Sequence, residues 1–231
     1  MKKVGIMQPY IFPYLGYFQV LNAVDEYVIY DDVQFIKGGW INRNNILVNG
    51  QKILFTLSLE GASPNKLINE IKVGDSDLQK LPKTLAQAYA RAPQKAPVLD
   101  LVTRICSYDD HNLARFIGNS LHEMVAYLEI PTKLVYSSSL KKDTSLKGQD
   151  KVLAICKELG AEMYINSIGG QELYDRAAFS AQGVELKFLK SDLIEYPQLG
   201  GAFMPGLSII DVMMFNSPAQ TRQLLEAYEL I

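Results

Sequence analysis

The N-terminal segment constrains the fold most, because it reads as a strand, a loop, a helix and a second strand. Val4–Met7 is a short apolar run closed by Gln8-Pro9, which predicts a buried strand running into a loop. Tyr14–Val24 has apolar residues at helical spacing, and Glu26–Val33 is rich in β-branched and aromatic residues. Strand, helix and strand within about 30 residues form a βαβ unit, which implies a right-handed crossover and a parallel sheet.

The same alternation returns near the C-terminus after an interruption. Asn49-Gly50 between two β-rich runs predicts a hairpin, and the residues between Asp77 and Leu128 predict helices, most clearly at Asn112–Leu128. From Thr132 onward the expected strands are Thr132–Ser137, Met163–Asn166 and Val184–Leu189, and the expected helices are Lys147–Leu159, a short one from Gln171, Leu207–Phe215 and Pro218–Tyr228. The predicted fold class is α/β, with a parallel-sheet core built from an N-terminal βαβ and a C-terminal βαβαβ segment.

A β-hairpin and a mostly helical insertion separate these two parts of the core. We expect one domain over 1–231, with the α/β core at about 1–60 and 131–231 and a helical subdomain at about 61–130.

Composition narrows the classes of partner. The 231-residue chain is 48% hydrophobic and 21% charged with a net charge of −2, which argues against nucleic acid as the main ligand. No run approaches the roughly 18 apolar residues of a membrane span, so no membrane insertion is expected. Without a signal-peptide pattern at the N-terminus, the expected location is the cytoplasm. Cys106 and Cys156 are too few for a disulfide framework or a zinc site, and no metal site is predicted.

Candidate ligand-binding residues are densest in the segment Met7–Arg43. Gln8, Tyr10 and Tyr14 follow the first strand, at the end where α/β sheets bind ligands. Buried tyrosine hydroxyls need hydrogen-bond partners, which favours a site, although packing in the core remains an alternative for the aromatic residues of this loop.

Asp31-Asp32 closes the second expected strand. Such a pair can hold Mg²⁺ or orient an amine or a hydroxyl, and only one of two neighbours in a strand needs to face a site. In the alternative interpretation, one aspartate is solvated and the other bonds backbone donors. Because His111 and His122 build no catalytic triad or metal motif, we take Asp31, Asp32 and Tyr10 as the candidate catalytic residues.

Two further segments carry candidate substrate-binding residues. The loop Gln34–Asn45 combines a Gly38-Gly39 pair with residues that can stack on a ligand or hold phosphate or carboxylate, namely Lys37, Trp40, Asn42 and Arg43. In Asn166–Tyr174, glycines precede a helix, so backbone N–H groups could form an anion site with help from a hydroxyl; the candidates are Ser167, Gly169 and Gly170. A tight turn explains the second segment equally well.

The segment IMQPYIFPYLGYFQVLNAVDEYVIYDDVQFIKGGWINRN resembles the opening signature of the WbqC-like protein family. The resemblance rests on Gln8-Pro9-Tyr10, Pro13-Tyr14, Gly16-Tyr17, Tyr30–Gln34 and Trp40–Arg43. It continues through Ile155–Ala161, Asn166–Tyr174 and Leu207–Asp211, and so covers essentially the whole chain. Before the glycine pair, the family often has a Ser-rich or Pro-rich turn, whereas this chain has Asn166-Ser167-Ile168.

The resemblance implies a role linked to bacterial O-antigen, lipopolysaccharide and surface-polysaccharide gene clusters. We expect a transferase that moves an acyl or aminoacyl group onto the amine of a nucleotide-linked sugar, its small-molecule substrate; the cofactor is left unassigned. In that reading Lys37, Arg43 and the glycine turn contact the phosphate or donor, and an aspartate of Asp31-Asp32 activates the amine.

Two alternatives stay open. A nucleotidylyltransferase-like enzyme is suggested by the strand–loop–helix start, although Gly16-Tyr17 stands where that chemistry wants Gly-His. A non-catalytic binding protein of a polysaccharide-assembly pathway is the other.

Overall fold

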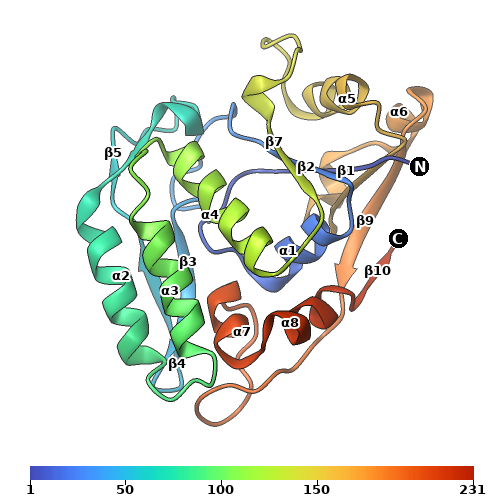
Figure 1. Ribbon diagram of the computed structural model, residues 1–231. Helices are drawn as coiled ribbons and strands as arrows, with labels where there is room; N and C mark the ends of the chain where they lie inside the picture. The colour runs from blue at the N-terminus through green and yellow to red at the C-terminus, as the bar shows by residue number, and fades with distance from the viewer.

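A six-stranded sheet forms the centre of the protein in a computed structural model that describes residues 1–231 (Figure 1). The strand order is β10-β9-β8-β1-β2-β7, in which β9, β8, β1, β2 and β7 run parallel and β10 joins the edge antiparallel to β9. The bounds are Lys3–Met7 (β1), Glu26–Ile29 (β2), Lys133–Tyr136 (β7), Met163–Ser167 (β8), Glu185–Ser191 (β9) and Tyr228–Leu230 (β10). This arrangement confirms the predicted α/β class and its parallel core.

Helices cover both faces of the sheet, as a parallel sheet requires. Val4 and Ile6 of β1 pack toward α5 (Gly148–Leu159) and α6 (Arg176–Ala181). Tyr27 and Ile29 of β2 face the opposite way, into the core that contains α1 (Leu15–Asn22) and α4 (Leu113–Tyr127). Alternation along each strand therefore divides the buried residues between two layers.

The insertion between β2 and β7 begins with a hairpin, β3 (Arg43–Val48) and β4 (Gln51–Thr56). Its turn residues Asn49 and Gly50 have φ of 50° and 75°, as the sequence predicts for this turn. The rest comprises β5 (Leu59–Glu60), a 3₁₀ turn (Ile68–Glu70), β6 (Lys72–Val73), α2 (Asp75–Ala88), α3 (Lys95–Cys106) and α4.

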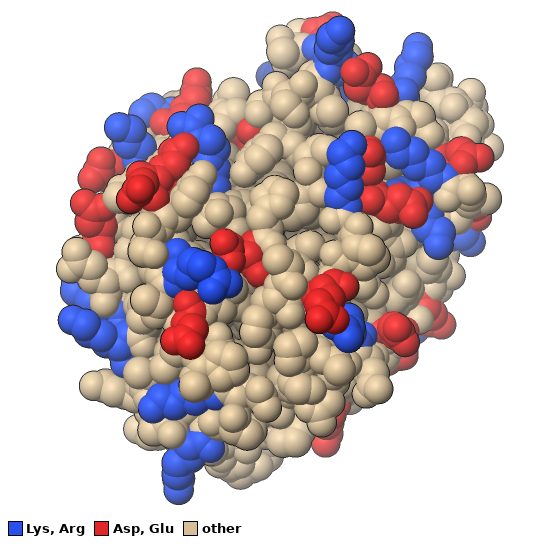
Figure 2. Space-filling model, in the orientation of Figure 1, with Lys and Arg blue, Asp and Glu red and all other residues tan.

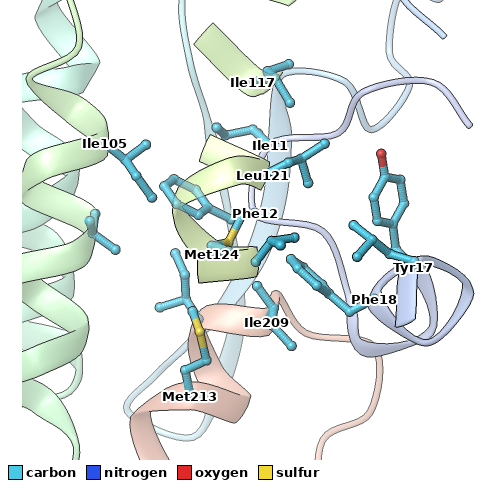
Figure 3. Packing of buried hydrophobic residues seen from close by; sticks show 14 of the residues in the cluster. Ile11, Phe12, Tyr17, Phe18, Ile105, Ile117, Leu121, Met124, Ile209 and Met213 are labelled. Atoms are coloured by element: carbon cyan, nitrogen blue, oxygen red, sulfur yellow. The ribbon is translucent and has the colours of Figure 1, made fainter. Parts of the chain in front are cut away.

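The helices of the insertion share one hydrophobic core with the sheet layer. Around Phe12, side chains from α3, α4 and the later helix α7 (Ile209–Phe215) converge (Figure 3). The residues that Figure 3 labels in this junction are Ile11, Phe12, Tyr17, Phe18, Ile105, Ile117, Leu121, Met124, Ile209 and Met213. The insertion is thus packed onto the core and holds the loop after β1 in place.

The C-terminal end differs from the expectation. The last helix, α8, covers Pro218–Leu225 and the chain then forms β10, where the sequence pattern extends the helix to Tyr228. Local residues mark two other helix ends: the Ser208 hydroxyl caps α7 by accepting from the Ile210 N–H at 3.2 Å, and Gly160, with φ of 62°, ends α5.

Charges of both signs are interspersed on the molecular face in Figure 2, and neither sign gathers into a broad field there. None of the helices combines the length and the hydropathy that a membrane crossing requires.

Candidate functional site

The chain changes direction in the sheet at β1. It moves through α1 to β2 on one side of β1, and it later places β8 on the other side. Ligands of open α/β sheets bind at the carboxyl ends of the strands at such a switch point. A cavity of about 870 Å³ lies there, lined by Ile6, Met7, Gln8, Tyr10, Tyr14, Tyr30, Val33, Ile36, Trp40, Asn44, Gly148, Asn166, Ser167, Gly169, Gly170, Leu173, Tyr174 and Gly206. We call it the main cavity.

Three of the segments singled out in the sequence meet around the main cavity. The loop after β1, the loop that follows β2 and the turn after β8 contribute Gln8, Tyr10, Tyr14, Trp40, Ser167, Gly169 and Gly170. The other candidate residues lie outside its lining, namely Asp31, Asp32, Lys37, Asn42 and Arg43.

The loop between β1 and α1 is held in an unusual backbone conformation. Phe12 has φ of 43° and is buried, a region that a bulky residue adopts only when its surroundings enforce it. The Asn44 amide and the Ser208 hydroxyl both donate to the Phe12 carbonyl, each at 2.7 Å. The loop that carries Tyr10 and Tyr14 is therefore fixed by contacts from β3 and from the start of α7.

Tyr17 has a structural role in the loop after β1. Its ring is fully buried and its hydroxyl donates to the Gln8 carbonyl at 3.0 Å. Tyr17 therefore supports the loop from behind and does not face a ligand in the way that a nucleotidylyltransferase-like Gly-His pair requires.

The lining of the main cavity is aromatic and neutral. Rings come from Tyr10, Tyr14, Tyr30, Trp40 and Tyr174, amides from Gln8, Asn44 and Asn166, and a hydroxyl from Ser167; the lining contains no Asp, Glu, Lys, Arg or His. Burial raises the pKa of Tyr10 and of Tyr14, so both hydroxyls stay protonated at neutral pH. The arrangement suits stacking on flat ligand faces and hydrogen bonding to hydroxyl or amide groups.

Asp31 bonds groups of the protein itself. Its carboxylate accepts from the Ser138 N–H at 2.9 Å, from the Ser138 hydroxyl at 2.6 Å and from the Asn69 amide at 3.3 Å. Asp31 is only 2% exposed. It thus joins the end of β2 to the turn after β7 and to the insertion.

Asp32 lies between two buried lysines. Its Oδ2 is 2.9 Å from Lys142 Nζ and 3.1 Å from Lys151 Nζ, and these lysine side chains are 2% and 6% exposed. Burial alone would raise the pKa of Asp32, but the ammonium groups of Lys142 and Lys151 outweigh it and hold the pKa below its usual value. Two ammonium groups therefore face the carboxylate of Asp32, while the neighbouring Asp31 carboxylate bonds Ser138 and Asn69.

The ammonium group of Lys151 lies close to one wall of the main cavity. Lys151 Nζ lies 5.4 Å from the ring centre of Tyr30, which lines the cavity. Gly148, the first residue of α5, also lines it, and a helix begins with the positive end of its dipole. The wall formed by Tyr30 and Gly148 is therefore the electropositive side of the cavity.

Two of the predicted binding residues shape the loop that presents Trp40. Arg43 donates to the Gly39 carbonyl at 2.8 Å and lies 5.7 Å from the Trp40 ring centre, while the Asn42 amide donates to the Leu57 carbonyl at 2.7 Å. Trp40 keeps 46% of its surface exposed. Lys37 is exposed and stands away from the cavity.

After β8 the chain forms a 3₁₀ helix, Ile168–Leu173, followed by α6, where the sequence predicts a short helix from Gln171. The Ser167 N–H donates to Asn166 Oδ1 at 2.8 Å. A Cβ on Gly170 would lie 2.6 Å from Asn166 Nδ2, so this glycine makes room for the Asn166 amide at the cavity wall.

Several lining residues are not among the sequence-predicted site residues. Tyr30, Asn44, Asn166 and Tyr174 stand inside or beside the segments already singled out, so their closeness to the chosen residues is a usable signal. Gly148 and Gly206 reach the cavity only through the long-range course of the chain, and no local pattern marks them.

Comparison of the sequence with known proteins identifies one relative and one protein family. The chain is 29% identical over 225 residues to the uncharacterized protein Rv1507c of Mycobacterium tuberculosis (strain ATCC 25618 / H37Rv), a similarity that covers 95% of this chain and 96% of that protein. No solved structure matches the chain. The profile of the WbqC-like protein family matches residues 8–223, which include the loop after β1, the loop with Trp40 and the turn after β8; the chain therefore belongs to the WbqC-like protein family.

Proposed function

We propose that this protein is a transferase that moves an acyl or aminoacyl group onto the amine of a nucleotide-linked sugar, in the assembly of a bacterial O-antigen or other surface polysaccharide. One observation carries the proposal: an aromatic, amide-lined cavity of about 870 Å³ at the carboxyl ends of β1 and β8. Small-molecule sites have volumes of roughly 300–1,000 Å³, so this cavity is large enough for a ligand with several rings.

The chemistry of the lining fits the parts of such a substrate. Trp40 and the tyrosines offer faces on which a base or a sugar ring can stack, while Gln8 and Asn166 offer amides for its hydroxyl groups. The wall at Tyr30 and Gly148 complements phosphate, because the Lys151 ammonium group lies next to the Tyr30 ring and α5 begins at Gly148.

The proposed reaction takes an acyl thioester as donor. The uncharged sugar amine attacks the thioester carbonyl carbon, a C–N bond forms and the C–S bond breaks. The proton that the nitrogen loses is taken up by the departing thiolate, so the products are an amide and a thiol. Because neither Asp31 nor Asp32 lines the cavity, we assign the protein's contribution to orientation of the two reactants, and the proton passes from the nitrogen to the thiolate through water.

Thermal unfolding with a ligand panel tests the proposal. The probes are a uridine-diphosphate-linked amino sugar, its counterpart with a hydroxyl in place of the amine, and ATP or CTP with Mg²⁺. A ligand at 100 times its Kd stabilises a protein by about 2.7 kcal/mol, which is roughly 5–10 °C in Tm for a chain of this size. We expect the amino-sugar nucleotide to give the largest increase.

The other possible results of this ligand panel either support an alternative function or contradict the proposal. Stabilisation by ATP or CTP with Mg²⁺ and none by the sugar nucleotides supports nucleotidyl transfer and contradicts the proposal. An unmoved Tm across the whole panel contradicts it as well. Mass spectrometry of the sugar nucleotide after incubation with acyl and aminoacyl thioesters then separates a transferase, which adds the mass of the acyl group, from a non-catalytic binding protein.

A further inference from the structure

A second, smaller cavity adjoins the main cavity. Its volume is about 160 Å³, and it shares Tyr14 and Gly206 with the main cavity. It lies between the start of α1 and the segment 191–207, and its lining is mostly apolar, with Leu15, Leu193, Ile194, Phe203, Leu207 and Val212. We call it the side cavity.

We propose that the side cavity binds the acyl group of the donor, so that the reacting carbonyl carbon lies at Tyr14, on the boundary with the sugar-binding cavity. This inference rests on the proposed function of the main cavity. It adds the class of donor: a short acyl chain that carries a hydrogen-bond donor, such as an aminoacyl or hydroxyacyl group.

Size and polarity limit what the side cavity can hold. Its volume of about 160 Å³ is well below the roughly 300–1,000 Å³ of whole small-molecule sites, so it accommodates only a small group. The apolar lining favours hydrocarbon, and the one charged side chain of the lining is the carboxylate of Asp192, which repels phosphate. A nucleotide or a sugar phosphate is therefore a poor occupant, and a short acyl chain is a good one.

Gln19 is a polar residue of the side-cavity lining with an unpaired acceptor. It is fully buried in α1 and belongs to the lining. Its Nε2 donates to the carbonyls of Leu224 at 3.1 Å and Ala227 at 2.9 Å, which fixes the orientation of the amide because carbonyls only accept. The Gln19 Oε1 is left without a hydrogen-bond partner. An unpaired buried acceptor is unfavourable, and an amino or hydroxyl group on the acyl chain would satisfy it.

The boundary between the two cavities depends on Gly16. A Cβ at this position would lie 2.7 Å from Tyr14 Cε2 and 2.8 Å from Ser191 Oγ. The missing side chain therefore allows the Tyr14 ring and Ser191 to close together over the start of α1, where the two cavities meet. This places one aromatic ring in contact with both reactants.

Donor preference tests the inference through a matched pair of variants. Phe203 lines only the side cavity and Leu173 only the main cavity. Product formation is measured by mass spectrometry with the amino-sugar nucleotide and straight-chain acyl thioesters from acetyl to octanoyl, together with glycyl and alanyl thioesters. For the unmodified protein we expect the aminoacyl donors to react at least tenfold faster than plain acyl donors of equal length, and we expect octanoyl to be excluded.

Phe203→Ala should shift the preferred chain length upward by two carbons or more, whereas Leu173→Ala should raise KM for the sugar nucleotide and leave the donor preference unchanged. Product formation with a donor profile that Phe203→Ala does not alter overturns the inference and leaves the proposed function intact. Equal rates for aminoacyl and plain acyl donors overturn the role given to Gln19.

A binding readout keeps the inference testable without turnover. Butanamide soaked into crystals of the full chain is expected in the side cavity, and hexanamide is expected there only in Phe203→Ala. Absence of butanamide from the side cavity at saturating concentration overturns the inference. Absence of any product together with bound butanamide contradicts the proposed transfer instead.

Discussion

Asp32 divides its carboxylate between two lysines that are almost fully buried. Burying three charged groups is unfavourable unless each has partners, and here Lys151 Nζ also donates to the Asp32 carbonyl at 2.6 Å. The cluster joins the end of β2 to α5 and to the loop before it. It therefore combines a structural role with the Lys151 ammonium group that lies close to one wall of the main cavity.

Replacing Asp32 by Asn should destabilise the protein strongly. Both ammonium groups would lose their carboxylate while remaining buried, which typically costs about 3–5 kcal/mol in free energy of unfolding. Urea unfolding followed by circular dichroism measures this change. Asp143→Asn, a change at an exposed carboxylate, serves as the control and should leave the unfolding midpoint unchanged. A midpoint of Asp32→Asn equal to that of the control would contradict the account of the cluster.

Asp32 and Asp211 should give pH dependences of opposite sign. The pKa of Asp32 lies below its unfolded value, because its hydrogen bonds outweigh burial, so its contribution to stability is present above about pH 4 and is lost as pH falls through the folded pKa. Burial raises the pKa of Asp211 despite hydrogen bonds from Tyr89, Tyr196 and Gln198. Its contribution is therefore complete below about pH 4 and is lost as pH rises through the raised pKa.

Urea midpoints measured across the acid range test these signs. Asp32→Asn should flatten the loss of stability on the acid side, and Asp211→Asn should flatten the loss that occurs as pH rises above about 4. A variant that keeps the full pH dependence of the unmodified protein would show that the named aspartate is not its source.

At the scale of elements, α4 approaches β7 closely because position 118 has no side chain. A Cβ on Gly118 would lie 2.0 Å from the Tyr136 hydroxyl oxygen and 2.6 Å from Cζ of the same ring. Tyr136 is the last residue of β7 and immediately precedes the turn that Asp31 holds. A side chain at position 118 would therefore displace Tyr136 and disturb the end of β7 next to the site.

Gly118→Ala should destabilise the protein even though alanine is the better helix former. The helix gains up to about 1 kcal/mol from the substitution, but overpacking against Tyr136 costs roughly 1–3 kcal/mol, so we expect a lower Tm. Gly169→Ala is the matched control, because nothing lies within 4 Å of a Cβ at that position. A Tm of Gly118→Ala at or above that of the unmodified protein would contradict the described contact.

The segment 192–207 is tied down at Asp211 of α7. The Tyr196 hydroxyl donates to Asp211 at 2.9 Å and the Gln198 amide at 3.1 Å, and Tyr89, just after α2, donates at 2.8 Å. Tyr196 lines the side cavity, and Gly206 at the end of this segment lines both cavities, so the anchor helps to position the cavity walls.

Tyr196→Phe should loosen this segment without unfolding the protein. Losing a hydrogen bond to a carboxylate costs about 1.5 kcal/mol or more, which raises the frequency of local opening roughly tenfold. Hydrogen exchange measured by mass spectrometry should show faster exchange in 192–207 and unchanged exchange in the central strands. Uniformly faster exchange, or no change in the segment, would contradict the role of the anchor.

Over the whole molecule, the parallel core follows from local patterns. Each strand and helix is marked by its own spacing of apolar residues, and the handedness of βαβ units limits how they can be arranged. β10 could not be predicted in this way, because it has only three residues and is a strand only through its pairing with β9. Nothing in Tyr228–Leu230 distinguishes it from the end of a helix.

The sequence predicts those parts of the site that lie at the ends of strands. Gln8, Tyr10 and Ser167 were predictable because they stand at or just after the carboxyl ends of parallel strands, and these ends share an edge. The surroundings of Asp31 and Asp32 were not, because β2 ends at Ile29 and both aspartates lie beyond it, where strand alternation does not apply. Their partners, such as Ser138 and Lys151, come from more than 100 residues away.

The central claim is that the main cavity binds a nucleotide-linked amino sugar, and Trp40 provides a direct measurement. It is the only tryptophan of the chain and lines the cavity, so the intrinsic tryptophan emission reports on this site alone. Titration with the uridine-diphosphate-linked amino sugar should change the emission saturably, with the Kd that calorimetry gives, and Trp40→Phe should abolish the signal. Calorimetric binding that leaves the Trp40 emission unchanged, or no binding at all, would contradict the account.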